Sequence, residues 1–188
     1  MTKFESAWVD TYFNSGVDIA NRRVFLGDID AQSVDKAVRG LYLMETECDQ
    51  QPCEMFISSY GGDIYEALAL YDIMNTLQCP IHTFAYGKCM SAAPLLLAAG
   101  SKGNRWVSPN VFLMHHDWSA EVDGKGQSLQ ETVRHYTKLN ARWIALLSAH
   151  SNKNIKWWTS RAVKSNDFYF DANEAIEWGL ADNIWDEN

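Results

Sequence analysis

The chain alternates short apolar runs with longer segments, and this alternation constrains its fold more than any other feature. Runs typical of buried strands occur at residues 23–27, 54–58, 80–86 and 111–114. Patterns that indicate helices occur at residues 31–45, 64–77, 91–99, 127–149 and 173–178. Gly87 is expected to end the third strand, and the helix at 127–149 to bury one apolar stripe against the sheet. Alternating strands and helices predict an α/β fold with a mainly parallel sheet.

Length, charge and cysteine usage limit the class of protein that this chain can belong to. The 188 residues suit one domain, 1–188, with residues 1–20 as a mobile N-terminal segment. A net charge of −8 without a Lys/Arg cluster argues against nucleic acid or an anionic membrane as partner. There is no long apolar run and no secretory signal pattern. The 4 cysteines form no zinc-like pair, so they are interpreted as reduced thiols of a cytoplasmic protein, with an organellar or viral copy left open.

Residues suited to catalysis follow three of the predicted strands. These are Gly61-Gly62, Ser91 and His115-His116. Ligands bind outside the carboxyl ends of strands in open α/β sheets. A serine hydroxyl becomes a nucleophile when a histidine base and an orienting carboxylate lie beside it. Ser91 also begins a predicted helix, whose N-terminus favours an oxyanion.

Each candidate residue also has a purely structural interpretation. Ser91 suits a helix N-cap, Gly61-Gly62 a tight turn, and His116 a buried core histidine. Asp167 suits a turn or a helix cap. The chain order Ser, His, Asp differs from those of the α/β-hydrolase, chymotrypsin and subtilisin types, and the Gly-x-Ser-x-Gly elbow is absent. Taken one at a time, these residues leave the choice between structure and catalysis open.

Several motifs in one order resemble the ClpP family, the proteolytic subunits of the Clp machines, over about residues 22–184. They are Arg23-Val-Phe-Leu, Ile57-Ser-Ser-Tyr-Gly-Gly, Gly87-Lys-Cys-Met-Ser, Pro109-Asn-Val-Phe-Leu-Met-His-His, and Asp167 followed by Ala172-Asn-Glu-Ala-Ile-Glu-Trp-Gly-Leu. The resemblance implies a ClpP/crotonase-like fold of repeated β-β-α units. It also implies a protruding handle helix, here within residues 117–149.

The same resemblance implies roles for individual residues. Ser91 matches the family's nucleophile, His116 its general base and Asp167 the carboxylate that orients the base. Gly62 and Ala92 match the donors of the oxyanion N–H groups. The implied activity is a serine endopeptidase that cleaves peptides and unfolded polypeptides inside a chamber of heptameric rings, stacked as a tetradecamer. The family works with an AAA+ Clp unfoldase, so ATP enters only through that partner, and neither a cofactor nor a metal serves the chemistry.

Some positions depart from the family pattern. His115 stands where the family has Ile, which is why His116 matches the base. Ala92 replaces a large side chain beside the nucleophile, which leaves the cleavage preference open, and Asp117-Trp118 replaces Gln-Pro after the histidine. Asn166 replaces the Arg that commonly pairs the rings, which predicts a weaker double ring.

Two other functions compete with the peptidase. One is a non-catalytic ring subunit of the same family, although such copies typically lose triad residues. The other is a crotonase-type acyl-CoA enzyme, which would hold a thioester oxyanion on backbone N–H groups and would not need Ser91. Labelling of Ser91 by a fluorophosphonate favours the peptidase, and thioester turnover without labelling favours the crotonase.

Overall fold

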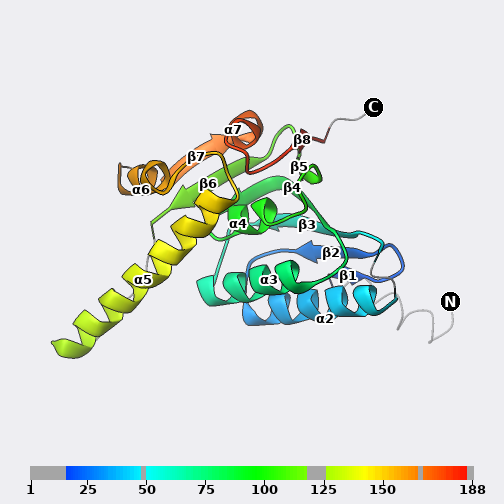
Figure 1. The fold of residues 1–188 in the computed structure, drawn as a ribbon, viewed down its shortest axis with the longest axis horizontal. Helices are drawn as coiled ribbons and strands as arrows, with labels where there is room; N and C mark the ends of the chain where they lie inside the picture. The colour runs from blue at the N-terminus through cyan, green and yellow to red at the C-terminus, as the bar shows by residue number, and fades with distance from the viewer. Residues whose placement is uncertain (1–15, 48–49, 118–125, 165–166, 186–188) are drawn as a thin grey trace.

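A computed structural model of the chain describes residues 16–47, 50–117, 126–164 and 167–185 (Figure 1). The first fifteen residues of the expected mobile segment and most of the loop at 117–126 lie outside this part. The strands are β1 (Val17–Asp18), β2 (Arg23–Leu26), β3 (Cys53–Ser59), β4 (Ile81–Met90), β5 (Arg105–Val107), β6 (Phe112–His116), β7 (Asp167–Asp171) and β8 (Asn183–Ile184). The helices are α2 (Ala31–Glu47), α3 (Ile64–Thr76), α4 (Ala93–Ala98), α5 (Gln127–Ala149), α6 (Ile155–Lys164) and α7 (Ala172–Glu177).

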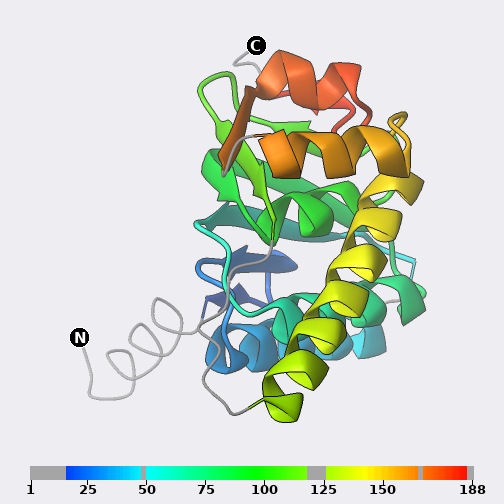
Figure 2. The ribbon, with the colours of Figure 1, turned by 90° about the vertical axis from the view of Figure 1, so that its left-hand side faces the viewer.

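The predicted α/β class and parallel sheet are confirmed. Strands β2, β3, β4 and β5 pair in parallel, and β8 extends this sheet beside β5. Strands β6 and β7 form an antiparallel pair, and β6 also pairs in parallel with the last residues of β4. In Figures 1 and 2, α2 and α3 lie at one end of the molecule, and α6 and α7 lie at the other.

The expectation that Gly87 ends its strand is wrong, because β4 continues to Met90. Residues 83–85 of β4 pair with β5, and residues 88–90 pair with β6. Gly87 lies between the two sections with a φ of +63°, a backbone conformation that glycine adopts without the steric penalty of a Cβ. Gly87 therefore lies where β4 changes its pairing partner from β5 to β6. The pairing with β6 places the end of β4 beside the strand that ends at His116.

One face of the β2–β4 sheet is covered by α2 and α3, and its buried side chains alternate along the strands. In β3, for example, Met55 and Ile57 are buried while Phe56 points the other way and is only half-buried. The other face carries a row of rings in contact across neighbouring strands. They are Phe25, Phe56, Phe84 and Trp106, with Trp185 packed beside two of them. Phe25 and Trp185 remain 47% and 45% exposed in the single chain.

A buried ion pair anchors α4 to the rest of the fold. The Arg105 guanidinium contacts the Asp182 carboxylate, with Nη2 2.5 Å from Oδ1, and also donates to the carbonyl of Ala98 at the end of α4. The six residues of α4 are all buried. Helix α4 is therefore held at its C-terminal end by Arg105 and by burial along its whole length.

Helix α5 has the predicted bounds but only half of its predicted burial. Trp143, Ile144 and Leu147 in its C-terminal half are buried, whereas Leu129 and Val133 near its start are exposed. Its N-terminal turns extend beyond the sheet, as expected of a handle (Figure 1). The prediction that the whole stripe packs against the sheet is thus wrong, because the first half of the helix has no sheet beside it.

Candidate active site

Ser91 lies in the sharp turn between β4 and α4. Its φ is +56°, which is uncommon for a residue with a side chain and costs of order 1 kcal/mol or more. The Ser91 N–H donates to the carbonyl of Met114 in β6 at 2.8 Å, so it is not available to a substrate. Helix α4 begins two residues later, with Ala92 at its N-cap and no side-chain cap bond. Ser91 is therefore not a helix cap, and its hydroxyl remains for another role.

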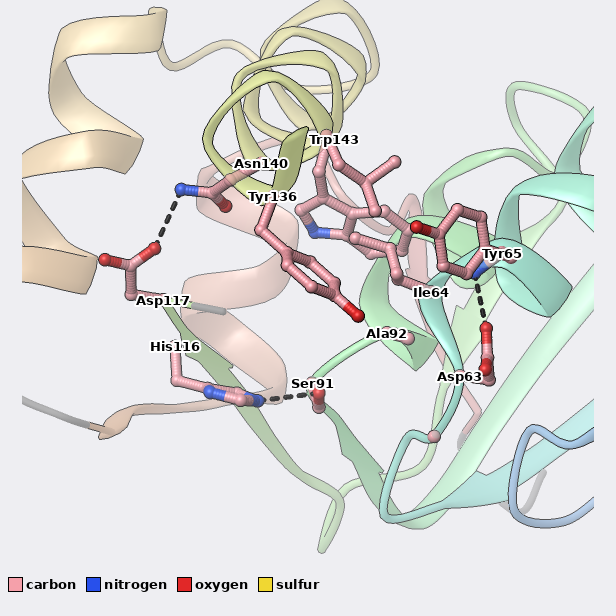
Figure 3. Close-up of a pocket in the computed structure, with 12 residues that line it drawn as sticks. Asp63, Ile64, Tyr65, Ser91, Ala92, His116, Asp117, Tyr136, Asn140 and Trp143 are labelled. Atoms are coloured by element: carbon pink, nitrogen blue, oxygen red, sulfur yellow. Dashed lines mark hydrogen bonds between the residues drawn. The ribbon is translucent and has the colours of Figure 1, made fainter. Parts of the chain in front are cut away.

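His116 ends β6 and contacts Ser91 directly. Because β6 pairs in parallel with the last residues of β4, the two strand ends lie together. The Ser91 Oγ lies 2.7 Å from His116 Nε2, within hydrogen-bonding distance (Figure 3). This is the arrangement of a nucleophile and its general base.

The neighbouring histidine faces the opposite side of the strand. His115 is buried, and its ring packs edge-on against Trp158 of α6 at a centroid distance of 5.3 Å. Its Nε2 has no hydrogen-bond partner among the described residues. Burial, with the nearby His116, lowers the pKa of His115 to about 4, so this ring is neutral at pH 7. The structure thus places His116, and not His115, at Ser91.

Asp167 opens β7, directly opposite His116 in the antiparallel pair. The sequence interpretation as a turn or a cap is wrong, since the residue belongs to a strand. Residues that face each other in such a pair have Cβ atoms about 5 Å apart on the same side of the sheet. The Asp167 side chain is exposed, and its Oδ2 accepts a long hydrogen bond of 3.5 Å from Tyr169. Within the described part of the chain, no hydrogen bond joins Asp167 to His116.

The two glycines fit closely against their surroundings. A Cβ at Gly61 would lie 2.5 Å from the Ser91 Cβ, and one at Gly62 would lie 2.0 Å from the carbonyl oxygen of Ile29. Gly61 and Gly62 also have φ values of +102° and +148°. Larger residues are therefore excluded at both positions, because Gly61 packs against Ser91 and Gly62 packs against the backbone of Ile29. Gly62 and Ala92 both line the cavity at Ser91, and in the described part of the chain neither N–H has a backbone acceptor.

A cavity of about 230 Å³ opens beside Ser91 and His116. Besides these two residues it is lined by Gly62, Asp63, Ile64, Tyr65, Ala92, Asp117, Tyr136, Leu139, Asn140 and Trp143. The α5 residues were not predicted as part of a site. Their three- and four-residue spacing shows that they share a helix face, but it does not say what that face packs against.

Comparison with known proteins identifies the family of the chain. The family model for Clp protease matches residues 10–188. The chain belongs to the Clp protease family. It is 32% identical to the "ATP-dependent Clp protease proteolytic subunit 1" of Rhodopirellula baltica, over 88% of this chain and 73% of that protein. It is 28% identical to the "ATP-dependent Clp protease proteolytic subunit" of Deinococcus radiodurans, over 90% and 82% of the two chains.

Membership of the Clp protease family implies peptidase activity and confirms the resemblance inferred from the motifs. In the described part of the chain, no group of three or more His, Cys, Asp or Glu side chains could hold a metal. The helices described here are too short or too polar to cross a membrane. Cys53, Cys79 and Cys89 are free thiols in the core.

Proposed function

We propose that this Clp protease family member is a serine-type endopeptidase that cleaves peptides and unfolded polypeptides. The observation that most supports this is the 2.7 Å contact between Ser91 Oγ and His116 Nε2. A hydroxyl hydrogen-bonded to a neutral imidazole can transfer its proton as it attacks a carbonyl carbon. The strained turn at Ser91 holds that hydroxyl at the edge of a cavity that could receive a substrate.

The proposed reaction begins when His116 accepts the Ser91 proton and Ser91 Oγ bonds to the carbonyl carbon of the substrate. The carbonyl oxygen becomes an oxyanion, to which the N–H groups of Gly62 and Ala92 donate. His116 then gives its proton to the departing amine, and the peptide bond breaks. Water, activated in turn by His116, hydrolyses the acyl-enzyme and restores Ser91. These steps use protein groups and water, so we propose that catalysis needs no cofactor or metal.

Asp167 is the proposed orienting carboxylate. Its register opposite His116 puts both side chains on one face of the β6–β7 pair. At the Cβ separation of facing residues, a change of rotamer brings an aspartate oxygen within reach of the imidazole Nδ1. Such a bond holds the tautomer whose Nε2 accepts the serine proton. The Asp167 carboxylate is exposed in the single chain, so a neighbouring subunit of an assembled ring can reach it. We propose that such a contact holds the rotamer that faces His116.

Covalent labelling tests the proposal. A fluorophosphonate reacts with an activated serine, and we expect it to modify Ser91 alone, as located by peptide mapping. Denatured protein serves as the control, because unfolding separates Ser91 from His116 and removes the activation. Thioester turnover without labelling would support the crotonase-type alternative instead, and absence of both reactions would support a non-catalytic ring subunit.

The active form is proposed to be a ring of self-associated subunits, heptameric and stacked in pairs, that receives substrates from an AAA+ Clp unfoldase. The relatives named above are called ATP-dependent, which supports an ATPase partner. Exposed apolar side chains support contacts with further chains. They are the aromatic residues Phe25 and Trp185 on the sheet face opposite α2 and α3, and Leu129 and Val133 at the start of α5. ATP would be hydrolysed by the unfoldase, not by this chain.

Assembly and activity are expected to fall together on dilution. Asn166, which lies outside the described residues, replaces a ring-pairing Arg, so single rings should be detectable beside double rings. Ring separation should lower peptidase activity because Asp167, adjacent to that contact, would no longer hold His116. Analytical ultracentrifugation across a dilution series, with peptidase assays on the same samples, measures both. A fully active monomer at every concentration would contradict the assembly, and a double ring that never dissociates would contradict only the argument from Asn166.

A further inference from the structure

Helix α5 forms one wall of the cavity beside Ser91 ahead of the point where it enters the core. Tyr136, Leu139 and Asn140 line the cavity, yet the side chains that α5 buries all come later in the helix. These buried side chains are Trp143, Ile144 and Leu147. Because the first turns of α5 extend beyond the sheet, the position of this wall depends on contacts with other elements (Figure 1).

A hydrogen bond ties this part of α5 to α3. The Tyr65 hydroxyl lies 2.6 Å from His135 Nε2, and the two rings stack with centroids 6.1 Å apart and an angle of 12° between their planes. Tyr65 also lines the cavity, across from Tyr136 (Figure 3). His135 precedes Tyr136 in α5, is exposed, and lies outside the lining of the cavity. The bond therefore joins the two sides of the cavity through a residue that a substrate in it would not touch.

A second pair of the same kind joins α3 to the other end of α5. The Tyr71 hydroxyl lies 2.8 Å from Nε2 of His150, the C-cap residue of α5. Both residues lie outside the lining of the cavity. The buried side chains of α5 already fix this end of the helix, so loss of the Tyr71 hydroxyl should not move the wall. The second pair is therefore a matched control for the first.

We propose that Tyr65 and His135 are positioning residues of the peptidase, whose bond holds the α5 wall in place to receive a substrate side chain. The inference rests on the proposed peptidase function and takes the cavity as the place of an apolar side chain next to the cleaved bond. Ile64, Leu139 and Trp143 supply apolar surface for it. Without the bond, each binding event would have to order the wall, so affinity would fall while the chemistry at Ser91 stayed the same.

Matched peptides test the wall. Fluorogenic peptides carry leucine or alanine on either side of the cleaved bond, and at one of these positions wild type should prefer leucine, the side chain long enough to reach the wall. In Tyr65→Phe and in His135→Ala, kcat/KM for the leucine peptide should fall about threefold to tenfold through KM, as loss of one hydrogen bond allows. Hydrolysis of the alanine peptide should not change. A loss of folded protein would instead lower both rates together and leave their ratio unaltered.

Three further variants assign the effect to the bond. Tyr65→Phe combined with His135→Ala should lose no more than either change alone, because both remove the same interaction. His135→Gln keeps an amide group that can pair with the Tyr65 hydroxyl, and it should recover most of the leucine-to-alanine ratio. Tyr71→Phe should keep the wild-type ratio.

Several outcomes overturn the inference. They are an unchanged ratio in Tyr65→Phe or His135→Ala, additive losses in the double variant, an equal fall in Tyr71→Phe, and a wild type that does not prefer leucine at either position. The proposed function would still stand in these cases, because the peptides would be cleaved in a Ser91-dependent way. Absence of any hydrolysis by wild type would overturn the proposed function and the inference with it.

Discussion

Replacing Ser91 with alanine is expected to abolish peptide hydrolysis. The loss in kcat should be on the order of 10⁶, the size seen when a triad nucleophile is removed from a serine peptidase. The expectation follows from the contact between Ser91 Oγ and His116 Nε2, since without the oxygen no acyl-enzyme can form. Hydrolysis of a short fluorogenic peptide by purified Ser91→Ala, compared with wild type at equal concentration, measures it.

The fold and the assembly should survive this substitution. The bond from the residue 91 N–H to the Met114 carbonyl is made by the backbone and is retained in alanine. Ser160→Ala is the matched control: the Ser160 hydroxyl donates to the Trp157 carbonyl within α6, and this variant should leave turnover intact. Wild-type turnover by Ser91→Ala, with an unchanged sedimentation profile, would refute the proposed mechanism.

The sequence predicted the proximity of Ser91 and His116 better than it predicted the bounds of the elements around them. Ser91 and His116 were assigned to the ends of two strands, and parallel pairing brings such ends to the same edge of a sheet. That argument needs only the order of strands and helices. Asp167 could not be placed in the same way, because β7 is antiparallel and its start lies in a polar segment without a clear period. The segment at residues 155–164 was left without a helix for a similar reason, because its adjacent tryptophans do not show a single apolar stripe.

The contribution of α5 to the cavity was not predicted from the sequence, for a different physical reason. The Tyr136, Leu139 and Trp143 spacing shows one face of a helix, but periodicity gives no partner for that face. In the fold, one part of this stripe packs in the core and another part borders the cavity. Asn140 and Asp117 are polar and 23 residues apart, and their hydrogen bond exists only because β6 ends beside α5. Long-range contacts between polar residues of this kind leave no local pattern in a sequence.

The adjacent histidines should respond in opposite ways to substitution. His116→Ala should lose about as much activity as Ser91→Ala, because members of a triad act as one unit. His115→Ile should keep most of its activity, since the His115 side chain lies on the far side of the strand against Trp158. Peptidase assays on the two purified variants decide between them. Loss of activity in His115→Ile with retention in His116→Ala would mean that the register of β6 is wrong by one residue.

His115→Ile should also make the protein more stable, increasingly so in acid. At pH 7 the variant removes a buried Nε2 that has no hydrogen-bond partner in the described structure, a gain of about 1 kcal/mol in the free energy of unfolding. The pKa of His115 is lowered to about 4 in the fold, against 6.5 for an ordinary histidine, so between these pH values the unfolded chain binds a proton that the folded chain does not. Wild-type stability therefore falls as the pH drops from about 6.5 toward 4, by about 2 kcal/mol at pH 5.

Isoleucine does not titrate, so this part of the pH dependence should disappear in His115→Ile. Urea unfolding at pH 7 and pH 5, at one fixed protein concentration, gives the two free energies for each protein. Wild type measured under the same conditions is the reference for the variant at each pH. If His115→Ile and wild type lose equal stability between pH 7 and pH 5, the buried neutral His115 does not contribute to acid sensitivity, and other groups must account for it.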